Sequence, residues 1–471
     1  MVRGAALSQP EGDGATHYDL ILIGTGSGNS IIGPEMDAMR IAIVERDLFG
    51  GTCLNRGCIP SKMFVVAAEA ARTAADSRRL GIYSHFDRAD WPAIVERVFG
   101  RIDPIAEGGR VYRHSLDNVT VYEGDGRFSG ERQVEVRGND GQVSTITGDQ
   151  VVIATGARAH LPEIAGLDEV AFHTSDTIMR LPALPGHLIV VGGGFIACEM
   201  ADVFAAFGSK VTVIQRSDLL LRSEDHDIAQ RFTELASERF DLRLNTTISR
   251  VESDHGVIRA ITEHGEVLGD TLLIATGRQP NGDQLNGDAA AVAIDANGAV
   301  VVDEFGRTTA PGVWALGDVN GRYQLKHMAN GEAKVIRHNV MHPNDLRPFD
   351  SRPAPHGVFA EPQIGAVGLT EAECAGRDVA VITHPYGDAA YGWALEDTAG
   401  FVKLIGDRAT RTLIGAHVIG VHAATLVQLL IQGMHLGNTV DQLATGQIWI
   451  HPTLAEVVEQ ALLKLIDAFD S

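Results

Sequence analysis

Short apolar runs that lead into glycine-rich turns predict the first strands of the protein. Residues 18–23 and 188–191 are followed at once by such turns, and residues 41–44 and 211–214 form the next apolar run in each case. A buried strand, a glycine turn and a second strand are typical of a nucleotide-binding unit. The repetition predicts two Rossmann-like units in one chain.

The remaining apolar positions predict helices and a further domain. Alanines and valines recur at helical spacing in residues 63–79, and a second helix is predicted in residues 91–113. Residues 119–143 are rich in β-forming residues. Beyond a proline-rich linker at residues 345–355, strand and helix patterns with their own apolar content predict another domain.

The first glycine turn has the chemistry of a phosphate-binding site. Gly24 permits the tight turn, Gly26 lets a pyrophosphate approach the backbone, and Gly28 continues the turn into a helix-compatible stretch. Asn29 stands where a third glycine is usual. Glu45 ends the second strand, about 20 residues on, where an acid accepts the ribose hydroxyls of an adenosine. We predict an FAD site.

Residues 50–62 place Cys53 and Cys58 in one turn-rich segment. One helical turn between them would bring the sulfurs within bonding distance, and a helix start favours a thiolate. Arg56 and Lys62 would add positive charge. The alternative is a structural pair of buried thiols, which fits poorly between glycines and directly after a dinucleotide unit.

The second glycine turn, at Gly192 and Gly194, predicts a pyridine-nucleotide site. Its second strand ends in Gln215 and Arg216 instead of an acid, and Arg222 follows. An acid would repel the extra phosphate of NADPH, whereas two arginines bind it by charge-assisted hydrogen bonds. We therefore predict NADPH. The alternative is that both arginines are solvated loop charges.

Both predicted nucleotide units end in an Ala-Thr-Gly segment. Thr155 and Gly156 close the first unit and Gly277 closes the second. The chain then returns to the flavin through residues 309–318, where the Asp318 carboxylate would accept a hydrogen bond from the ribityl chain. The alternative is that Asp318 is a turn residue with no contact to the flavin.

A histidine near the end of the chain supplies a candidate base. His451 precedes a predicted helix and Glu456 lies five positions on. A thiolate that leaves a disulfide must be protonated, and an imidazole oriented by a carboxylate carries that proton in both directions.

Composition narrows the class of protein. The chain has 471 residues, 45% of them apolar, and this length is enough for roughly three domains. Its formal net charge of -22 argues against a nucleic-acid or anionic-membrane partner. The composition of residues 1–17 predicts a flexible extension and not a signal peptide. No apolar span has the length of a transmembrane helix. With only Cys198 and Cys374 besides the central pair, we expect a reducing, cytoplasmic location and burial of both extra thiols. We predict no metal site.

Together these segments resemble the flavoprotein disulfide reductase family over nearly all of the chain after His17. The family's disulfide motif matches residues 50–62, its nucleotide motifs match residues 24–28 and 192–197, and its C-terminal signature matches residues 451–456. The resemblance implies an α/β fold with two Rossmann-like FAD/NAD(P)-binding domains plus a C-terminal α+β dimerisation domain.

The resemblance also implies a domain division. Residues 1–16 would be the flexible extension, 17–160 and 286–345 the FAD-binding domain, 161–285 the NADPH-binding domain, and 346–471 the interface domain. It further implies an obligate homodimer with active sites shared between the subunits.

The family's reaction sequence implies roles for the cysteine pair. NADPH reduces FAD, Cys58 beside the flavin takes the electrons, and Cys53 attacks the substrate disulfide before Cys58 resolves the mixed disulfide. His451 and Glu456 of one subunit complete the site of the other. Arg56 departs from the family, which usually has a small apolar residue there.

Several further residues match cofactor positions of the family. Lys62 and Glu199 match an ion pair near the hydride-accepting flavin nitrogen, and Phe195 matches the aromatic residue that gates the nicotinamide pocket. Gly51 and Thr52, at the start of the disulfide motif, belong to the cofactor-binding positions.

Five more segments narrow the resemblance to a branch that reduces the disulfide of a sugar thiol. They are residues 23–30, 62–64, 98–105, 386–393 and 446–452. We predict NADPH-dependent reduction of such a small-molecule disulfide. A lipoamide dehydrogenase or glutathione-type reductase is the alternative within the family, and a flavin-binding subunit without catalysis is the alternative outside it.

Overall fold

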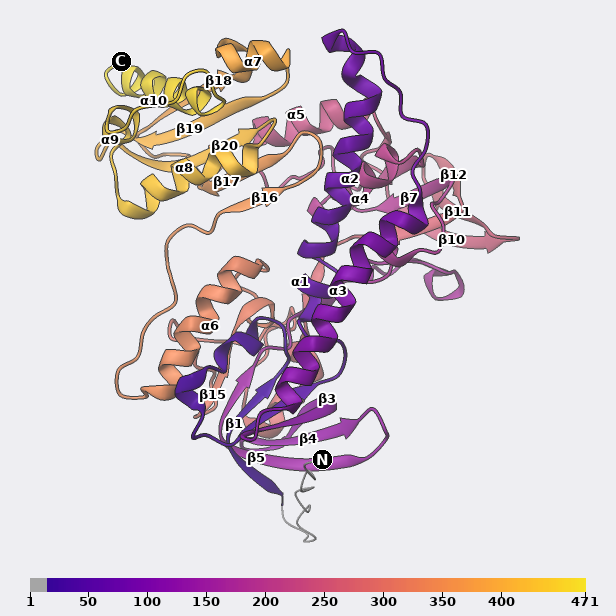
Figure 1. Cartoon of the computed structure of the whole chain (residues 1–471), viewed down its shortest axis with the longest axis vertical. Coiled ribbons are helices and arrows are strands. Elements are labelled where there is room, and N and C mark those ends of the chain that lie inside the picture. The colour runs from indigo at the N-terminus through magenta and orange to yellow at the C-terminus, as the bar shows by residue number, and fades with distance from the viewer. Residues whose placement is uncertain (1–14) are drawn as a thin grey trace, which may run out of the picture. The chain divides into compact units, whose positions relative to one another are not determined.

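The computed structural model describes residues 15–471 and contains helices and strands throughout (Figure 1). The chain divides into two compact units. The first unit holds the described residues up to Gly51 with Ile105–Ala157 and Gln279–Asp350, and the second holds Thr52–Pro104, Arg158–Arg278 and Ser351–Ser471. The predicted mixed α/β class is confirmed.

A sheet with buried faces forms the centre of the first unit. Its strands are β1 (Thr16–Ile23), β2 (Ile41–Glu45), β3 (Val119–Gly130), β4 (Gln133–Gly138), β5 (Val143–Ile153) and β15 (Val313–Ala315). Strands β3, β2, β1, β5 and β15 are adjacent in that order and parallel, while β4 pairs antiparallel with one end of β3 and of β5.

The apolar run of β1 is explained by burial on both sides of this sheet. Ile21 and Ile23 belong to one core cluster, and Leu20 and Leu22 belong to another. Helix α6 (Lys326–Met341) packs on the second cluster. A strand covered on both faces needs apolar residues in succession, which is why the sequence reads as a run and not as an alternation.

The structure corrects the start of the first unit. Strand β1 begins at Thr16, so residues 16 and 17 are not part of a flexible extension. The His17 ring bonds the hydroxyl of Thr147 and the carboxylate of Asp149 on the neighbouring chain segment. The rest of the predicted extension, residues 1–14, lies outside the described residues.

The prediction of a helix directly after the first glycine turn is also wrong. Only two short 3₁₀ helices follow, η1 (Ser27–Ile31) and η2 (Pro34–Met36). Gly33 between them is extended, with φ -136° and ψ 173°. Because a proline disfavours the helical conformation of the residue before it, Pro34 ends the helix there.

The second unit contains the second nucleotide-binding unit. Its parallel sheet has the order β13 (Thr271–Ile274), β7 (His187–Val191), β8 (Lys210–Ile214) and β9 (Asp241–Arg243). Helices α4 (Phe195–Ala206) and α5 (His226–Ser237) follow β7 and β8, and the strands β10 (Ile248–Asp254), β11 (Val257–Thr262) and β12 (Gly265–Gly269) form an antiparallel sheet. The strands expected at residues 188–191 and 211–214 are confirmed.

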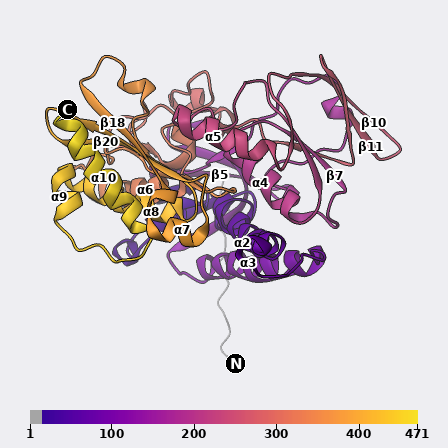
Figure 2. The ribbon, with the colours of Figure 1, turned by 90° about the horizontal axis from the view of Figure 1, so that it is seen from above.

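Helix α2 (Cys58–Asp76) packs against this nucleotide-binding unit. Phe64 of α2 stacks on Trp91, which also contacts Phe204 of α4. Trp91 begins α3 (Trp91–His114), which runs beside α2 in both views (Figures 1 and 2). Helix α2 is therefore fixed by a buried aromatic cluster, and the short helix α1 (Gly51–Asn55) precedes it.

The C-terminal part of the second unit is a five-stranded antiparallel sheet with helices. The sheet order is β16 (His356–Val358), β17 (Ile364–Gly368), β20 (Thr412–Ile419), β19 (Phe401–Asp407) and β18 (Val379–Pro385). The helices are α7 (Ala390–Leu395), α8 (Ala423–Leu436), α9 (Val440–Thr445) and α10 (Ala455–Phe469). Helices α8 and α10 share one core cluster on this sheet (Figure 1).

A buried lysine of the sheet pairs with carboxylates at and near the start of α5. Lys403 of β19 is 1% exposed and bonds Asp225, Asp227 and Glu371. Burial opposes the charge of Lys403, but the hydrogen bonds of these carboxylates raise its pKa.

The two units do not correspond one to one with the predicted domains, because residues 52–104 join the second unit. The three-domain division stays a prediction. No helix within residues 15–471 is long and apolar enough to cross a membrane.

Candidate active site

The two central cysteines lie on successive helices of the disulfide motif. Cys53 is in α1 and Cys58 is the first residue of α2. A side chain at Gly57 would place its Cβ 3.1 Å from the carbonyl oxygen of Thr52 and 3.4 Å from the Cα of Cys53. Glycine therefore permits the close approach of the two helices, and both cysteines are present as thiols.

Their surroundings favour a thiolate at Cys58. A hydrogen bond from Cys53 lowers the pKa of Cys58 most strongly, burial opposes it, and a backbone hydrogen bond and Lys62 lower it further. The net effect lowers the pKa of Cys58 to about 7. The expected contribution of Lys62 is present, whereas the contributions assigned to the helix start and to Arg56 stay predictions.

The residues predicted as an ion pair are in direct contact. Lys62 Nζ lies 2.7 Å from Glu199 Oε2, although the two residues are far apart in sequence. The other carboxylate oxygen of Glu199 accepts the backbone N–H of Phe359 at 3.0 Å. The phenyl ring of Phe359 also faces the lysine, with its centroid 4.0 Å from Nζ. Sequence reasoning missed Phe359, because nothing local marks it.

The C-terminal histidine and its acid also meet. His451 Nδ1 lies 2.7 Å from Glu456 Oε1, and Glu456 Oε2 accepts the backbone N–H of Thr453. The hydrogen bond with His451 lowers the pKa of Glu456. A proton on Nδ1 is thereby directed to the carboxylate, which leaves Nε2 to exchange protons. The His451 side chain is 72% exposed.

The glycines of the two nucleotide turns occupy equivalent places. Gly24 has φ 102° and Gly192 has φ 120°, and a Cβ on either would lie within 2.4 Å of a carbonyl oxygen, that of Ala154 or Ala275 respectively. Only glycine fits these positions. Gly194 caps α4, and Phe195, its first residue, is exposed.

Both predicted phosphate-binding arginines adjoin the second turn. The side chain of Gln215 lies over Gly193, where a Cβ would be 2.6 Å from the glutamine Nε2, and Arg216 follows directly. The backbone N–H of Leu221 donates to the carbonyl of Gly193 at 2.7 Å, and Arg222 follows. Both arginines are exposed. This arrangement fits a nucleotide phosphate, and it gives Gln215 a packing role that the sequence did not indicate.

In the first unit, Glu45 is held beside the first turn. Its carboxylate accepts the backbone N–H of Thr25 at 2.8 Å and the Thr25 hydroxyl at 2.6 Å. A Cβ on Gly28 would lie 2.5 Å from that of Ala154, and a Cβ on Gly51 would lie 2.7 Å from the Cα of Gly26. These close approaches leave the turn no room for larger residues.

Three cations gather around the segment after this turn. Arg113 is buried and bonds both the side chain and the carbonyl of Asn29, which explains how asparagine replaces the usual glycine. Lys326 donates to the hydroxyl of Ser27, and Arg337 donates to the carbonyl of Ile31. The positive surroundings suit a pyrophosphate although no long helix begins there.

Two further features of the first unit fit a bound flavin nucleotide. The hydroxyl of Thr155 is buried and has no partner within the described residues, and the adjacent Gly156 has φ 66°. Asp318 lies in η8 (Gly317–Asn320), whose Gly317 N–H and Asn320 amide both donate to the buried carboxylate of Glu332. Burial raises the pKa of Glu332. This support for the Asp318 turn was not predicted.

The remaining predicted residues have structural positions. Gly277 follows β13, and its carbonyl accepts the N–H of His160. The backbone carbonyl of Thr52 accepts the backbone N–H of Arg56. Cys198 and Cys374 are buried, as expected, and burial raises the pKa of both thiols.

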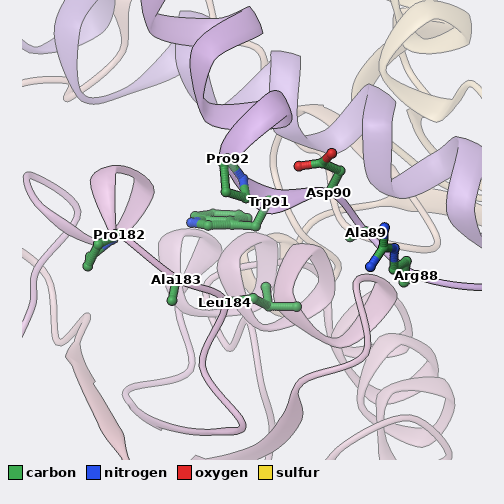
Figure 3. Close-up of a pocket in the computed structure, with 8 residues that line it drawn as sticks. All are labelled: Arg88, Ala89, Asp90, Trp91, Pro92, Pro182, Ala183 and Leu184. Atoms are coloured by element: carbon green, nitrogen blue, oxygen red, sulfur yellow. The ribbon is translucent and has the colours of Figure 1, made fainter.

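A shallow pocket of about 280 Å³ lies elsewhere in the second unit (Figure 3). It is lined by Arg88–Pro92 and Pro182–Leu184, with the indole of Trp91 as its wall. None of the predicted site residues lines it. Among residues 15–471 no group of three or more histidines, cysteines or acids is arranged to hold a metal ion.

Comparison with known family models matches two successive segments of the chain. A family model described as pyridine nucleotide-disulphide oxidoreductase matches residues 18–333, and the dimerisation domain of that family matches residues 354–462. The match covers both nucleotide turns, the cysteine pair and the C-terminal histidine.

Individual relatives align along nearly their whole length. A mycothione reductase of Mycobacterium tuberculosis is 47% identical over 458 residues, which is 95% of this chain and 99% of that protein. A glutathione reductase of Burkholderia cepacia is 32% identical, with 93% and 97% covered. The structure of the flavoprotein disulfide reductase RclA from Escherichia coli matches with a TM-score of 0.84 and 29% identity, covering 97% of this chain and 99% of that one.

Proposed function

Because the chain belongs to the pyridine nucleotide-disulphide oxidoreductase family, we propose that it reduces mycothione, the disulfide of mycothiol, with electrons from NADPH. The predicted cofactors, FAD and a pyridine nucleotide, are those of the family. The observation that carries the substrate is the 47% identity, over nearly the full length of both chains, to a protein named mycothione reductase.

The chemistry of the cysteine pair supports a disulfide reductase. Bound FAD would supply the route by which the two electrons of NADPH reach the disulfide of Cys53 and Cys58, which with one proton opens to a thiol and a thiolate. Cys53 then attacks one sulfur of mycothione, so that one mycothiol leaves and a mixed disulfide remains. Cys58 attacks the Cys53 sulfur, the second mycothiol leaves, and the enzyme disulfide forms again. A Cys58 pKa of about 7 makes the resolving thiolate available at neutral pH.

His451 serves as the acid and base of the exchange. Each departing mycothiol thiolate needs a proton, and Cys53 must lose one before it attacks. The Glu456 contact holds the ring so that Nε2 carries out these transfers. The dimerisation domain supports a homodimer, in which His451 and Glu456 would serve the cysteine pair of the other subunit.

Lys62, Glu199 and Phe195 belong to the cofactor side of the reaction. The buried Glu199 neutralises and orients the Lys62 ammonium, which would stand beside the flavin ring. The exposed Phe195 begins α4, next to the glycine turn, where it would cover the nicotinamide pocket until NADPH displaces it. Arg216 and Arg222 would bind the extra phosphate of NADPH.

The test is steady-state oxidation of NADPH and of NADH by the purified yellow protein. Mycothione, oxidised glutathione and lipoamide are offered separately at matched concentrations. We expect the highest kcat/KM with mycothione and NADPH. A preference for lipoamide with NAD(H) would assign the chain to the lipoamide dehydrogenases, and bound flavin with no turnover of any disulfide would point to a non-catalytic subunit.

The proposed role is maintenance of the thiol redox balance in the cytoplasm.

A further inference from the structure

Phe359 makes two separate contacts with the Lys62–Glu199 pair. Its backbone N–H donates to Glu199 Oε1 at 3.0 Å, and its ring centroid lies 4.0 Å from Lys62 Nζ. The residue follows β16 in the C-terminal part of the second unit, roughly 300 positions after Lys62 in the sequence. Each member of the ion pair thus has a contact with the same residue.

We propose that Phe359 is a positioning residue, whose ring holds the Lys62 ammonium against Glu199 and so fixes a positive charge beside the redox-active cysteine pair. The proposal rests on the redox role proposed for Cys58, but it does not depend on which disulfide is the substrate.

The ring acts through attraction and through exclusion of water. An ammonium over an aromatic face is attracted by the ring quadrupole, and the attraction grows when the site is desolvated. The Glu199 side chain is 8% exposed and that of Lys62 is 31% exposed, so water reaches the pair from only part of its surroundings. Without the ring, water would screen the lysine, and its orientation would loosen.

The segment that carries Phe359 is itself held in place. Arg239 donates to the carbonyl of Glu361, and both Arg239 and Arg72 pair with the buried Asp202 of α4. Phe359 also packs against the apolar cluster that contains Phe64 of α2. The ring is therefore fixed to the helices that carry Lys62 and Glu199, which is what a positioning contact requires.

Cys58 reports the effect, because Lys62 lowers the Cys58 pKa and Glu199 raises it. If the ring keeps Lys62 desolvated and ordered, loss of the ring weakens the influence of Lys62 on Cys58. The backbone N–H of Phe359 survives any side-chain substitution at this position, so a change at this residue tests the ring alone.

The experiment is a pH titration of Cys58 in the FAD-loaded Cys53→Ser protein, without substrate. Every comparison is made within this parent, so the loss of the Cys53 thiol is common to all the variants, and the long-wavelength absorbance of a thiolate beside the flavin would follow ionisation. The rate of Cys58 alkylation by iodoacetamide, located by peptide mass, gives the same titration without the flavin signal.

F359L in this parent should raise the midpoint by no more than the shift that K62M produces in the same titration, because the ring acts on Cys58 only through the contribution of Lys62. F359Y keeps a ring and should titrate like the parent. F401L, which removes a ring from the same apolar cluster without a lysine contact, should also titrate like the parent. F359M replaces F359L if the leucine variant does not fold.

A double-mutant comparison decides whether the ring acts through Lys62. In a K62M background, F359L should leave the midpoint unchanged. The proposal is overturned if F359L does not raise the midpoint, if F401L raises it equally, or if the shift persists in K62M. An absent flavin signal with a normal alkylation titration would instead contradict the proposed place of Cys58 beside FAD, while the alkylation midpoints still decide the role of Phe359.

Discussion

The arginines beside the second glycine turn offer a direct test of nucleotide choice. We expect R216A and R222A to raise the KM for NADPH and to leave the KM for NADH nearly unchanged. Only NADPH carries the ribose phosphate that a guanidinium binds by charge-assisted hydrogen bonds. The chain neighbours of both arginines contact Gly193, so both side chains start close to the bound nucleotide.

The size of the effect follows from the exposure of these side chains. A hydrogen bond to a charged group contributes about 1.5–3 kcal/mol, and the exposed positions of Arg216 and Arg222 place each at the low end of that range. About 1.4 kcal/mol corresponds to a tenfold change in binding. Each single variant should therefore raise the KM for NADPH roughly tenfold, and the double variant roughly a hundredfold where the contacts are independent.

The assay is steady-state oxidation of each nucleotide with a saturating disulfide, with kcat and KM determined separately. R243A is the matched control: Arg243 ends the neighbouring strand β9, is about half exposed, and pairs with Asp241. Equal losses with NADPH and NADH, or an equal loss in R243A, would refute the phosphate role. Q215E should shift preference towards NADH, because a carboxylate there repels the phosphate and accepts ribose hydroxyls.

Three other changes test separate parts of the molecule. Cys53→Ser should abolish disulfide turnover but keep a thiolate absorbance of Cys58 that is lost at low pH, since protonation removes the thiolate; unchanged turnover would contradict the role of Cys53. His451→Ala should slow thiol–disulfide exchange by about 10²–10⁴-fold with flavin reduction by NADPH intact in stopped-flow traces, and a loss of that reduction would mean that the histidine acts elsewhere. Lys403→Met should lower the free energy of unfolding by about 3 kcal/mol, because the buried carboxylate of Asp225 loses its partner, whereas the exposed Lys464→Met should change it by less than about 1 kcal/mol; denaturation curves that shift equally would contradict the importance of burial.

Local patterns in the sequence were sufficient for the strands and the nucleotide turns. The runs before Gly24 and Gly192 are apolar because their strands are buried on both faces, and the glycines are required by positive φ angles. The same local reasoning failed at the stretch after the first turn, where Pro34 breaks the expected helix. It also placed the start of β1 two residues late, since the pairing of Thr16 and His17 with β5 has no apolar signal.

Contacts between distant residues were beyond such patterns. The Lys62–Glu199 pair was expected only through the resemblance to a family, and the position of Phe359 against that pair was not expected at all. The bond of Arg113 to Asn29 likewise explains the missing third glycine only once the fold brings α3 to the turn. Periodicity reveals which face of a helix or strand is buried, but it does not reveal which distant polar residue contacts that face.

The surroundings of His451 bear on the predicted assembly. A histidine that transfers protons within a redox site works best where water is excluded, yet this side chain is 72% exposed in the single chain. Ile448 and Ile450, just before it, are 97% and 72% exposed, which is unusual for large aliphatic residues placed so close together. Both observations are explained if another subunit covers this segment, and the match to a dimerisation domain at residues 354–462 supplies the means. In such a homodimer the exposed His451 would belong to the half of the active site that one chain contributes to its partner, and burial there would exclude water from the proton transfers.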